Sequence, residues 1–300
     1  MKKVLLFLLA SALTIGCASA PVAESPGVTK TTFTSGYAPI GGLKMYYEIH
    51  GKGEPLVLLP GGGSTIETTY GRILPFLARS RQVIAVEEQG HGHTADINRP
   101  LTFEQTADDV AELLRQLKVE KADIMGFSNG GNVALQIAIR HPAVVRKLVV
   151  ASAITRRDGM NPSFWEFMRH ADLAQMPEGL KAGYLAVAPD PKGLQAMHDK
   201  CRDRMLKFQD LRVKDVKSIQ APTLLVVGDI DVVRPEHAVH VMRLLPQARL
   251  AVLPGAHGEA IGEINVVRPG SRVPELTASL IEEFLVDTKP IERKEKKRDE

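Results

Sequence analysis

Short apolar runs alternate with longer segments of helical periodicity along most of the chain. Residues 44–50 alternate in the manner of a strand. Residues 55–59 form a continuous apolar run and residues 82–86 form another, as expected for strands that are buried on both faces. We expect further strands at residues 122–127, 145–151, 223–227 and 249–253.

Helices are predicted between these strands. Thr102 and Gln105 have the spacing of a capping box, and apolar residues then repeat at helical intervals. Residues 133–139 predict a buried helix because they are apolar on nearly every side. Pro235 suits the first turn of another helix, and a last one is expected around residues 276–285. This alternation implies an α/β fold, with a mostly parallel sheet flanked by helices.

Residues 152–215 interrupt the rhythm between two predicted strands. The segment reads as helical and apolar on one face, and it is rich in aromatic residues and methionine. Pockets are usually walled by such side chains, so we interpret the segment as a lid over the functional site. An extra packed helical layer is the alternative interpretation.

The N-terminus predicts export from a bacterial cell. A basic start precedes an apolar run that is too short to span a membrane, which is typical of a secretory signal at residues 1–16. Residues 13–17 resemble a lipobox that ends at Cys17, and they predict a lipid-tethered protein of the periplasm or outer membrane. Residues 18–20 offer the alternative of an ordinary signal peptide and a soluble secreted protein, although Pro21 disfavours cleavage there.

Composition predicts where the folded domain begins and ends. Residues 17–36 are rich in Ser, Thr, Pro, Gly and Ala and suit a linker. Residues 289–300 mix charges of both signs and suit a solvated, disordered tail. We therefore expect one domain at residues 37–288, because α/β chains of this length often form a single domain.

Charge and cysteine content limit the classes of partner that the protein is expected to bind. The formal net charge of +3 falls to +1 once the two lysines of the predicted signal are removed. A near-neutral chain without a basic stripe has no electrostatic footprint for nucleic acid, so we expect a small-molecule substrate. With Cys17 assigned to a lipid, Cys201 has no disulfide partner. No histidine or acid pattern marks Cys201 as a nucleophile, and we interpret it as incidental.

Ser128 lies in the most informative motif, in which Gly126 and Gly130 flank it at a spacing of two. The motif stands between a predicted strand and a predicted helix, which is the setting of a nucleophile elbow. The glycines leave room for a sharp turn, and the helix N-terminus offers N–H groups to an anion. The pattern predicts acyl-transfer chemistry, most simply hydrolysis. A glycine-rich loop before a core helix is the alternative.

A serine nucleophile needs a base, and the base needs an acid that orients it. The candidate base among the nine histidines is His257, which follows a predicted strand on a loop between glycines. The candidate acid is Asp231, at the end of another strand, and Asp229 is its competitor. We expect Asp229 to bind backbone N–H groups of its own turn instead.

The developing oxyanion also needs donors. The backbone N–H of Asn129 is one candidate, and that of Gly62, within the run at residues 60–63, is the other. His91 and His93 could suggest a metal, but no third ligand of suitable spacing is evident. We therefore predict a structural turn at these histidines, with no metal and no cofactor.

From about residue 44 to residue 286, the chain resembles the α/β-hydrolase superfamily. The resemblance implies an eight-stranded, mostly parallel sheet with a helical lid inserted after the sixth strand. It also implies that Ser128 is the nucleophile, Asp231 the acid and His257 the base, which agrees with the family's chain order. The motifs that carry it lie at residues 59–63, 87–94, 126–131, 228–231 and 255–257.

Three residues depart from the family pattern. Pro60 replaces the histidine that is usual before the oxyanion glycine, and Glu87 and Gln89 replace the usual aspartate and arginine. A long segment at residues 258–272 also separates the histidine loop from the last helix. These departures affect the loops and the pocket, and they leave the triad of Ser128, Asp231 and His257 unchanged.

We therefore expect a cofactor-free serine hydrolase that cleaves small carboxylic esters. In the superfamily the same triad also serves lactonases, aminopeptidases, carbon–carbon bond hydrolases and cofactor-free haloperoxidases. Ser128 argues against haloalkane dehalogenases and epoxide hydrolases, which use an aspartate at this position. The rival classes are a non-catalytic binding protein on the same scaffold and a membrane-tethered structural lipoprotein.

Overall fold

The computed structural model describes residues 32–266 and 268–289. The predicted signal peptide, Cys17 and residues 290–300 lie outside the described residues. Among the residues that are described, no helix is both long enough and apolar enough to cross a membrane.

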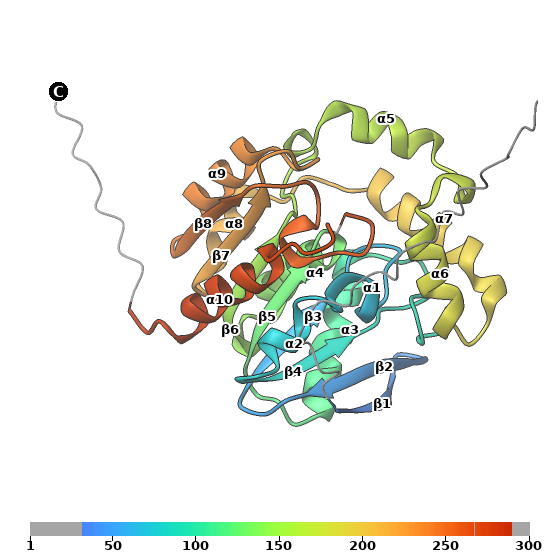
Figure 1. Ribbon diagram of the computed structural model, residues 1–300, viewed down its shortest axis with the longest axis horizontal. Helices are drawn as coiled ribbons and strands as arrows, with labels where there is room; N and C mark the ends of the chain where they lie inside the picture. Colours follow the sequence, from blue (N-terminus) through green and yellow to red (C-terminus); the bar gives the residue numbers. More distant parts are fainter. Residues whose placement is uncertain (1–31, 267, 290–300) are drawn as a thin grey trace, which may run out of the picture.

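Eight strands form a single sheet in the order β1-β2-β4-β3-β5-β6-β7-β8 (Figure 1). Strand β2 runs antiparallel to β1 and β4, and all the remaining pairs are parallel. The predicted mostly parallel, eight-stranded sheet is therefore confirmed. The strands are β1 (Phe33–Ile40), β2 (Leu43–His50), β3 (Glu54–Leu59), β4 (Arg81–Val86), β5 (Ala122–Phe127), β6 (Val145–Ala151), β7 (Thr223–Gly228) and β8 (Ala248–Leu253).

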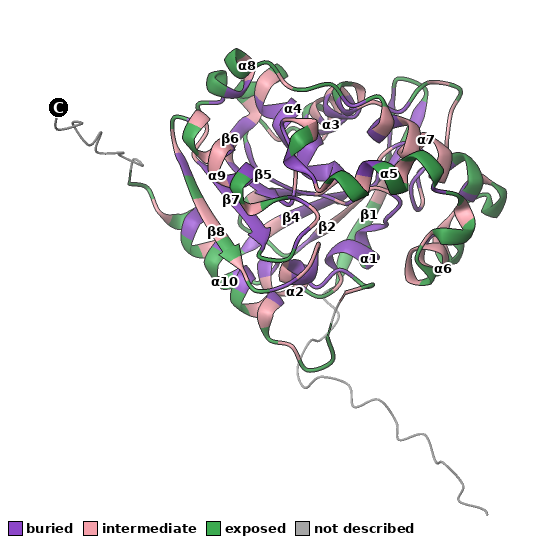
Figure 2. Cartoon of the chain, turned by 90° about the horizontal axis from the view of Figure 1, so that it is seen from above, coloured by how far each residue is buried: buried purple, intermediate pink, exposed green. Residues whose placement is uncertain are grey.

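Helices cover both faces of the sheet, and their buried sides meet the buried strands between them (Figure 2). One core contains residues of α3, α4, α8 and α9, and the other contains residues of α1, α2 and α10. The helices are α1 (Ile66–Tyr70), α2 (Leu74–Leu77), α3 (Phe103–Gln116), α4 (Asn129–Arg140), α5 (Pro162–His170), α6 (Glu178–Val187), α7 (Leu194–Leu206), α8 (Val213–Ser218), α9 (Pro235–Leu244) and α10 (Val273–Val286).

Strand β1 corrects the expected start of the domain. It begins at Phe33, within the segment that the sequence assigned to the linker before Tyr37. Residues 34–36 are Thr, Ser and Gly, which carry no apolar alternation. The strand exists because β2 pairs with it along its whole length, as far as Phe33 opposite His50. The rings of these two residues stack at 4.6 Å.

The interruption at residues 152–215 is helical, as predicted, and holds α5, α6, α7 and the first half of α8. It leaves the sheet after β6 and returns at β7, and these two strands are neighbours. At the point of departure, the Ser152 N–H donates to the Val226 carbonyl at 2.8 Å. The long excursion therefore leaves the sheet intact.

Candidate active site

Ser128 occupies the turn between β5 and α4. Its backbone angles, φ 54° and ψ −118°, are those of a turn position that glycine usually fills. The Ser128 N–H donates to the Ala151 carbonyl at 2.8 Å, which ties the turn to β6. A Cβ on Gly126 would overlap the Gly130 carbonyl, and a Cβ on Gly130 would overlap the Leu59 carbonyl. Both glycines of the motif are thus required by close backbone approach.

His257 lies in the loop that follows β8. Its Nε2 is 3.0 Å from Ser128 Oγ, and its Nδ1 is 2.8 Å from Asp231 Oδ1. A carboxylate only accepts hydrogen bonds, so Nδ1 carries a proton and Nε2 is free to accept the serine hydroxyl. The structure therefore joins the three predicted side chains in one hydrogen-bonded chain.

The Asp231 carboxyl group is fully buried at the end of β7. Its Oδ2 accepts a hydrogen bond from Ser152 Oγ at 2.6 Å, and its Oδ1 accepts one from the Val233 N–H at 2.9 Å. Burial alone would raise the pKa of Asp231, but the hydrogen bond to His257 and these two donors lower it overall. The carboxylate is therefore ionised where it faces the imidazole.

The sequence analysis singled out Asp229 but not Ser152. Asp229 accepts a hydrogen bond from the Gly255 N–H at 2.8 Å, so it binds backbone, as expected, but in the loop that carries His257 rather than in its own turn. Ser152 was missed by the sequence analysis. It follows β6 outside any motif, and only the side-by-side arrangement of β6 and β7 brings it to Asp231.

The glycine loop, defined as residues 60–63, follows β3 and lies against the first turn of α4. A Cβ on Gly62 would overlap the Asn129 side-chain amide, so the two candidate oxyanion residues are adjacent. Asn129 is the first residue of α4, and its backbone N–H therefore has no acceptor within the helix. This arrangement is compatible with a site for a developing negative charge.

The family model described as "alpha/beta hydrolase fold" matches residues 54–199, which include the glycine loop and the turn at Ser128. The chain belongs to the α/β-hydrolase superfamily.

Similar proteins agree with this assignment. Serine hydrolase BPHL from Homo sapiens is 29% identical over 274 residues, which cover 83% of this α/β-hydrolase and 89% of BPHL. The 2-hydroxymuconate semialdehyde hydrolase of Pseudomonas sp. strain CF600 is 33% identical over 162 residues, 48% of this chain and 56% of its own. The solved CarC serine hydrolase, involved in carbazole degradation, shares the fold with a TM-score of 0.68 and 22% identity, covering 85% of this chain and 99% of CarC. The names of the sequence relatives support hydrolase activity.

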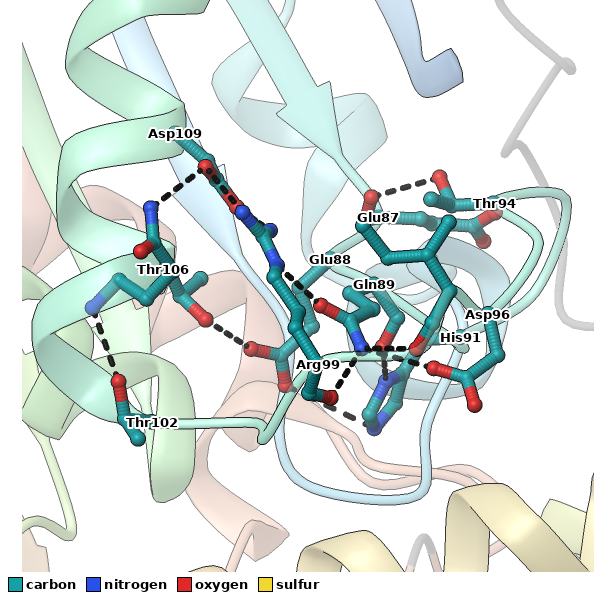
Figure 3. A network of polar contacts seen from close by, with 12 residues as sticks. Glu87, Glu88, Gln89, His91, Thr94, Asp96, Arg99, Thr102, Thr106 and Asp109 are labelled. Atoms are coloured by element: carbon teal, nitrogen blue, oxygen red, sulfur yellow. Dashed lines mark hydrogen bonds and ion pairs between the residues drawn. The ribbon is translucent and has the colours of Figure 1, made fainter. Parts of the chain in front are cut away.

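Glu87 stands where the superfamily usually has aspartate, and the loop after β4 is built around it (Figure 3). Its carboxylate accepts hydrogen bonds from the Ile66 N–H at 3.1 Å and from the His93 N–H at 2.6 Å. The His93 ring lies 2.9 Å from the same carboxylate, and this contact raises the pKa of His93. The longer acid therefore joins the start of α1 to the loop.

Gln89 stands where arginine is usual, and it also has several partners in Figure 3. Its amide nitrogen donates to Asp96 Oδ1 at 2.8 Å and to the Arg99 carbonyl at 3.0 Å. Its amide oxygen accepts a hydrogen bond from Arg99 Nε at 2.6 Å. Both departures from the family pattern are thus embedded in a local hydrogen-bond network.

Within the described part of the chain, no group of three or more His, Cys, Asp or Glu residues is placed to hold a metal ion.

Cys201, which the sequence analysis interpreted as incidental, lies next to His91. Its Sγ lies 3.2 Å from His91 Nε2, and the thiol is on α7 in the inserted segment. The two residues are 110 positions apart, so no local pattern could show the contact.

Two methionines of the inserted segment also approach the glycine loop. A Cβ on Gly63 would lie 3.2 Å from Met176 Cε and 3.8 Å from Met197 Sδ.

Proposed function

We propose that this α/β-hydrolase cleaves small carboxylic esters through an acyl-enzyme formed on Ser128. The observation that carries the proposal is the unbroken chain from Ser128 Oγ through the His257 ring to the buried Asp231 carboxylate. A serine hydroxyl is a weak nucleophile, and a base within hydrogen-bond reach is the usual means of activating it. The oriented imidazole of His257 provides that base.

In the acylation step, Ser128 Oγ attacks the carbonyl carbon of the ester as His257 Nε2 takes the hydroxyl proton. The Asp231 carboxylate stabilises the imidazolium that results. The N–H groups of Gly62 and Asn129 stabilise the carbonyl oxygen as it becomes negative, and each such donor is worth about 3 kcal/mol. His257 then gives its proton to the departing alcohol, and the acyl group stays on Ser128.

Deacylation repeats these steps with water as the nucleophile. His257 Nε2 takes a proton from water, the hydroxide oxygen attacks the acyl carbon, and the Ser128–acyl bond breaks as the proton returns to Oγ. The products are a carboxylic acid and the free enzyme. No cofactor takes part in this scheme.

The inserted segment at residues 152–215 is the proposed lid. Met176 and Met197 bring apolar groups to the glycine loop, where the acyl group would bind. Apolar walls with a few polar groups are typical of small-molecule pockets. We therefore expect acyl chain length to affect kcat/KM.

The first test is hydrolysis of p-nitrophenyl esters from acetate to decanoate. The wild-type protein is expected to turn over part of the series, and Ser128→Ala is expected to lose at least about 10³-fold in kcat. Ser279→Ala is the matched control, because Ser279 is exposed on α10 and should retain full activity. Turnover that persists in Ser128→Ala would refute the mechanism, and a wild type without turnover or fluorophosphonate labelling would favour the non-catalytic binding protein.

Carbon–carbon bond hydrolysis is the second candidate. It is favoured by the similarity to 2-hydroxymuconate semialdehyde hydrolase. A 2-hydroxy-6-oxo-2,4-dienoate loses its visible absorbance on cleavage, so its kcat/KM can be compared directly with that of the best ester. A larger value for the dienoate would replace the ester assignment, while Ser128 would remain the residue to test.

We also propose that the mature protein is exported and tethered to a membrane through Cys17. The lipobox-like residues 13–17 support this proposal. Cells fed labelled palmitate should label the wild type and not Cys17→Ser. Equal labelling of the two, or no labelling of either, would favour the ordinary signal peptide.

A further inference from the structure

His91 contacts the glycine loop directly. The Gly63 N–H donates to His91 Nε2 at 3.0 Å, and His91 Nδ1 lies 3.0 Å from the Gln89 carbonyl oxygen. A carbonyl oxygen only accepts, so Nδ1 carries a proton, and a backbone N–H only donates, so Nε2 must offer its lone pair. The contacts therefore define a neutral ring in one tautomer.

The position of Gly63 makes this hydrogen bond consequential. Gly63 has φ +73°, in the left-handed region that favours glycine, and it directly follows the proposed oxyanion donor Gly62. The peptide plane that contains the Gly63 N–H also contains the Gly62 carbonyl. Fixing that plane limits the rotation of Gly62 and so limits the direction of its own N–H.

The His91 ring is held in turn by α7. Glu88 Oε1 lies 3.6 Å from His91 Nε2, and the Glu88 carboxylate receives two hydrogen bonds of 2.7 Å from Arg204. Thr106 adds a hydrogen bond of 2.9 Å to Glu88, which Figure 3 shows together with His91. Cys201, one turn before Arg204 on α7, places its Sγ 3.2 Å from the same ring nitrogen.

These neighbours act on the ring in opposite senses. Burial lowers the pKa of His91, whereas Cys201 and Glu88 raise it, overall to about 9, and favour a proton on Nε2. The Gly63 N–H favours the lone pair instead, because a protonated Nε2 would set two donors face to face at 3.0 Å. We infer that the hydrogen bond from the Gly63 N–H determines the state of the ring and leaves Nε2 without a proton, because a backbone N–H can only donate.

We propose that His91 is a positioning residue for the reaction: its neutral ring accepts the Gly63 N–H and thereby holds the Gly62 N–H toward the developing oxyanion. The expected kinetic effect rests on the proposed function, whereas the expected geometry rests only on the tautomer of the His91 ring. The contacts to Glu88 and Cys201 connect this arrangement to the inserted helices. His91 itself has no contact with the hydrogen-bonded chain of Ser128 in this scheme and acts through the loop alone.

The kinetic test compares His91→Leu, which removes the acceptor, with His91→Gln, whose amide oxygen can replace Nε2. His91→Leu should lower kcat about 10- to 100-fold with little change in KM, since a donor displaced by about 1 Å costs up to 10²-fold. It should also weaken an alkyl trifluoromethyl ketone, whose adduct with serine bears an oxyanion, by a similar factor. His91→Gln should recover most of both losses. His141→Leu, outside the proposed lid and at the opposite end of α4 from Ser128, is the control and should match the wild type.

Thermal unfolding of each variant shows whether the fold is retained. A folded His91→Leu with wild-type kcat, or with reduced kcat but unchanged inhibition by the ketone, would overturn the proposal. Absence of Ser128-dependent turnover in the wild type would instead refute the proposed function. In that event the ¹⁵N shifts of the His91 ring still decide the geometry: a neutral ring with its proton on Nδ1 supports the proposal, and a protonated Nε2 overturns it.

Discussion

The backbone of Ser128 leads to a prediction about stability that is independent of the substrate. A non-glycine residue at φ 54° and ψ −118° occupies a sparsely populated region, and such a residue costs about 1–3 kcal/mol. Ser128→Ala removes the hydroxyl but keeps this strain, because alanine has a Cβ. Ser128→Gly removes both the hydroxyl and the strain.

The size of the difference follows from two opposing terms. Relief of strain favours the glycine variant by about 1–3 kcal/mol, and the greater freedom of glycine in the unfolded chain disfavours it by about 0.5–1 kcal/mol. Ser128→Gly should therefore be more stable than Ser128→Ala by about 1 kcal/mol. For a domain of this size, that corresponds to a Tm higher by about 2–4 °C.

Urea denaturation of the two variants measures the difference, and Ser279 supplies the control. Ser279 is exposed inside α10, where glycine should be less stable than alanine by about 1 kcal/mol. The order of glycine and alanine should thus be opposite at the two serines. A Ser128→Gly variant that is less stable than Ser128→Ala would show that this turn stores no strain and would refute the reasoning.

Three further predictions concern buried carboxylates. Asp231→Asn should lower kcat by about 10⁴-fold by favouring the wrong imidazole tautomer, whereas Asp229→Asn should lower it less than tenfold; comparable losses in the ester assay would contradict the assignment of the acid. Ser152→Ala should reduce the free energy of unfolding by about 1.5–3 kcal/mol, because a buried carboxylate loses a donor; unchanged urea denaturation would disprove this. Burial alone would raise the pKa of Glu88, but its neighbours, Arg204 first among them, lower it from 4.5 to about 2, so these contacts should contribute about 3 kcal/mol above pH 4.5, most of it from Arg204, that is lost as the pH falls towards 2. Arg204→Met should abolish most of that contribution, and a variant whose loss of stability is equal at pH 7 and pH 2.5 would argue against it.

The sequence was most informative where function constrains the backbone locally. Gly126 and Gly130 mark the turn at Ser128 because neither position has room for a Cβ. Asp231 and His257 could be assigned because each follows a strand, and the carboxyl ends of parallel strands meet at one edge of a sheet. The geometry brings these three residues together in one hydrogen-bonded chain.

What the sequence did not show depends on contacts between distant segments. Strand β1 has no apolar alternation at its start and is defined by pairing with β2. Ser152 reaches Asp231 only because β6 lies next to β7. The contact of Cys201 with His91 spans 110 positions and requires α7 to fold over the loop after β4. Local propensity carries no information about such pairs.

The departure of the inserted helices between two neighbouring strands has a consequence for how this enzyme could diversify. The backbone of Ser152 is bonded to β7 at the point of departure, and its hydroxyl holds Asp231 just after the chain returns. Both ends of the excursion are therefore anchored to the sheet, and the entropy of closing a loop between fixed ends grows only with the logarithm of its length. A change in the length of the exposed part of this segment should therefore cost little closure entropy, whereas α7 is tied to the rest of the fold by Arg204 and Cys201. Selection can thus reshape the pocket through the rest of the segment while α7 keeps its contacts with Glu88 and His91.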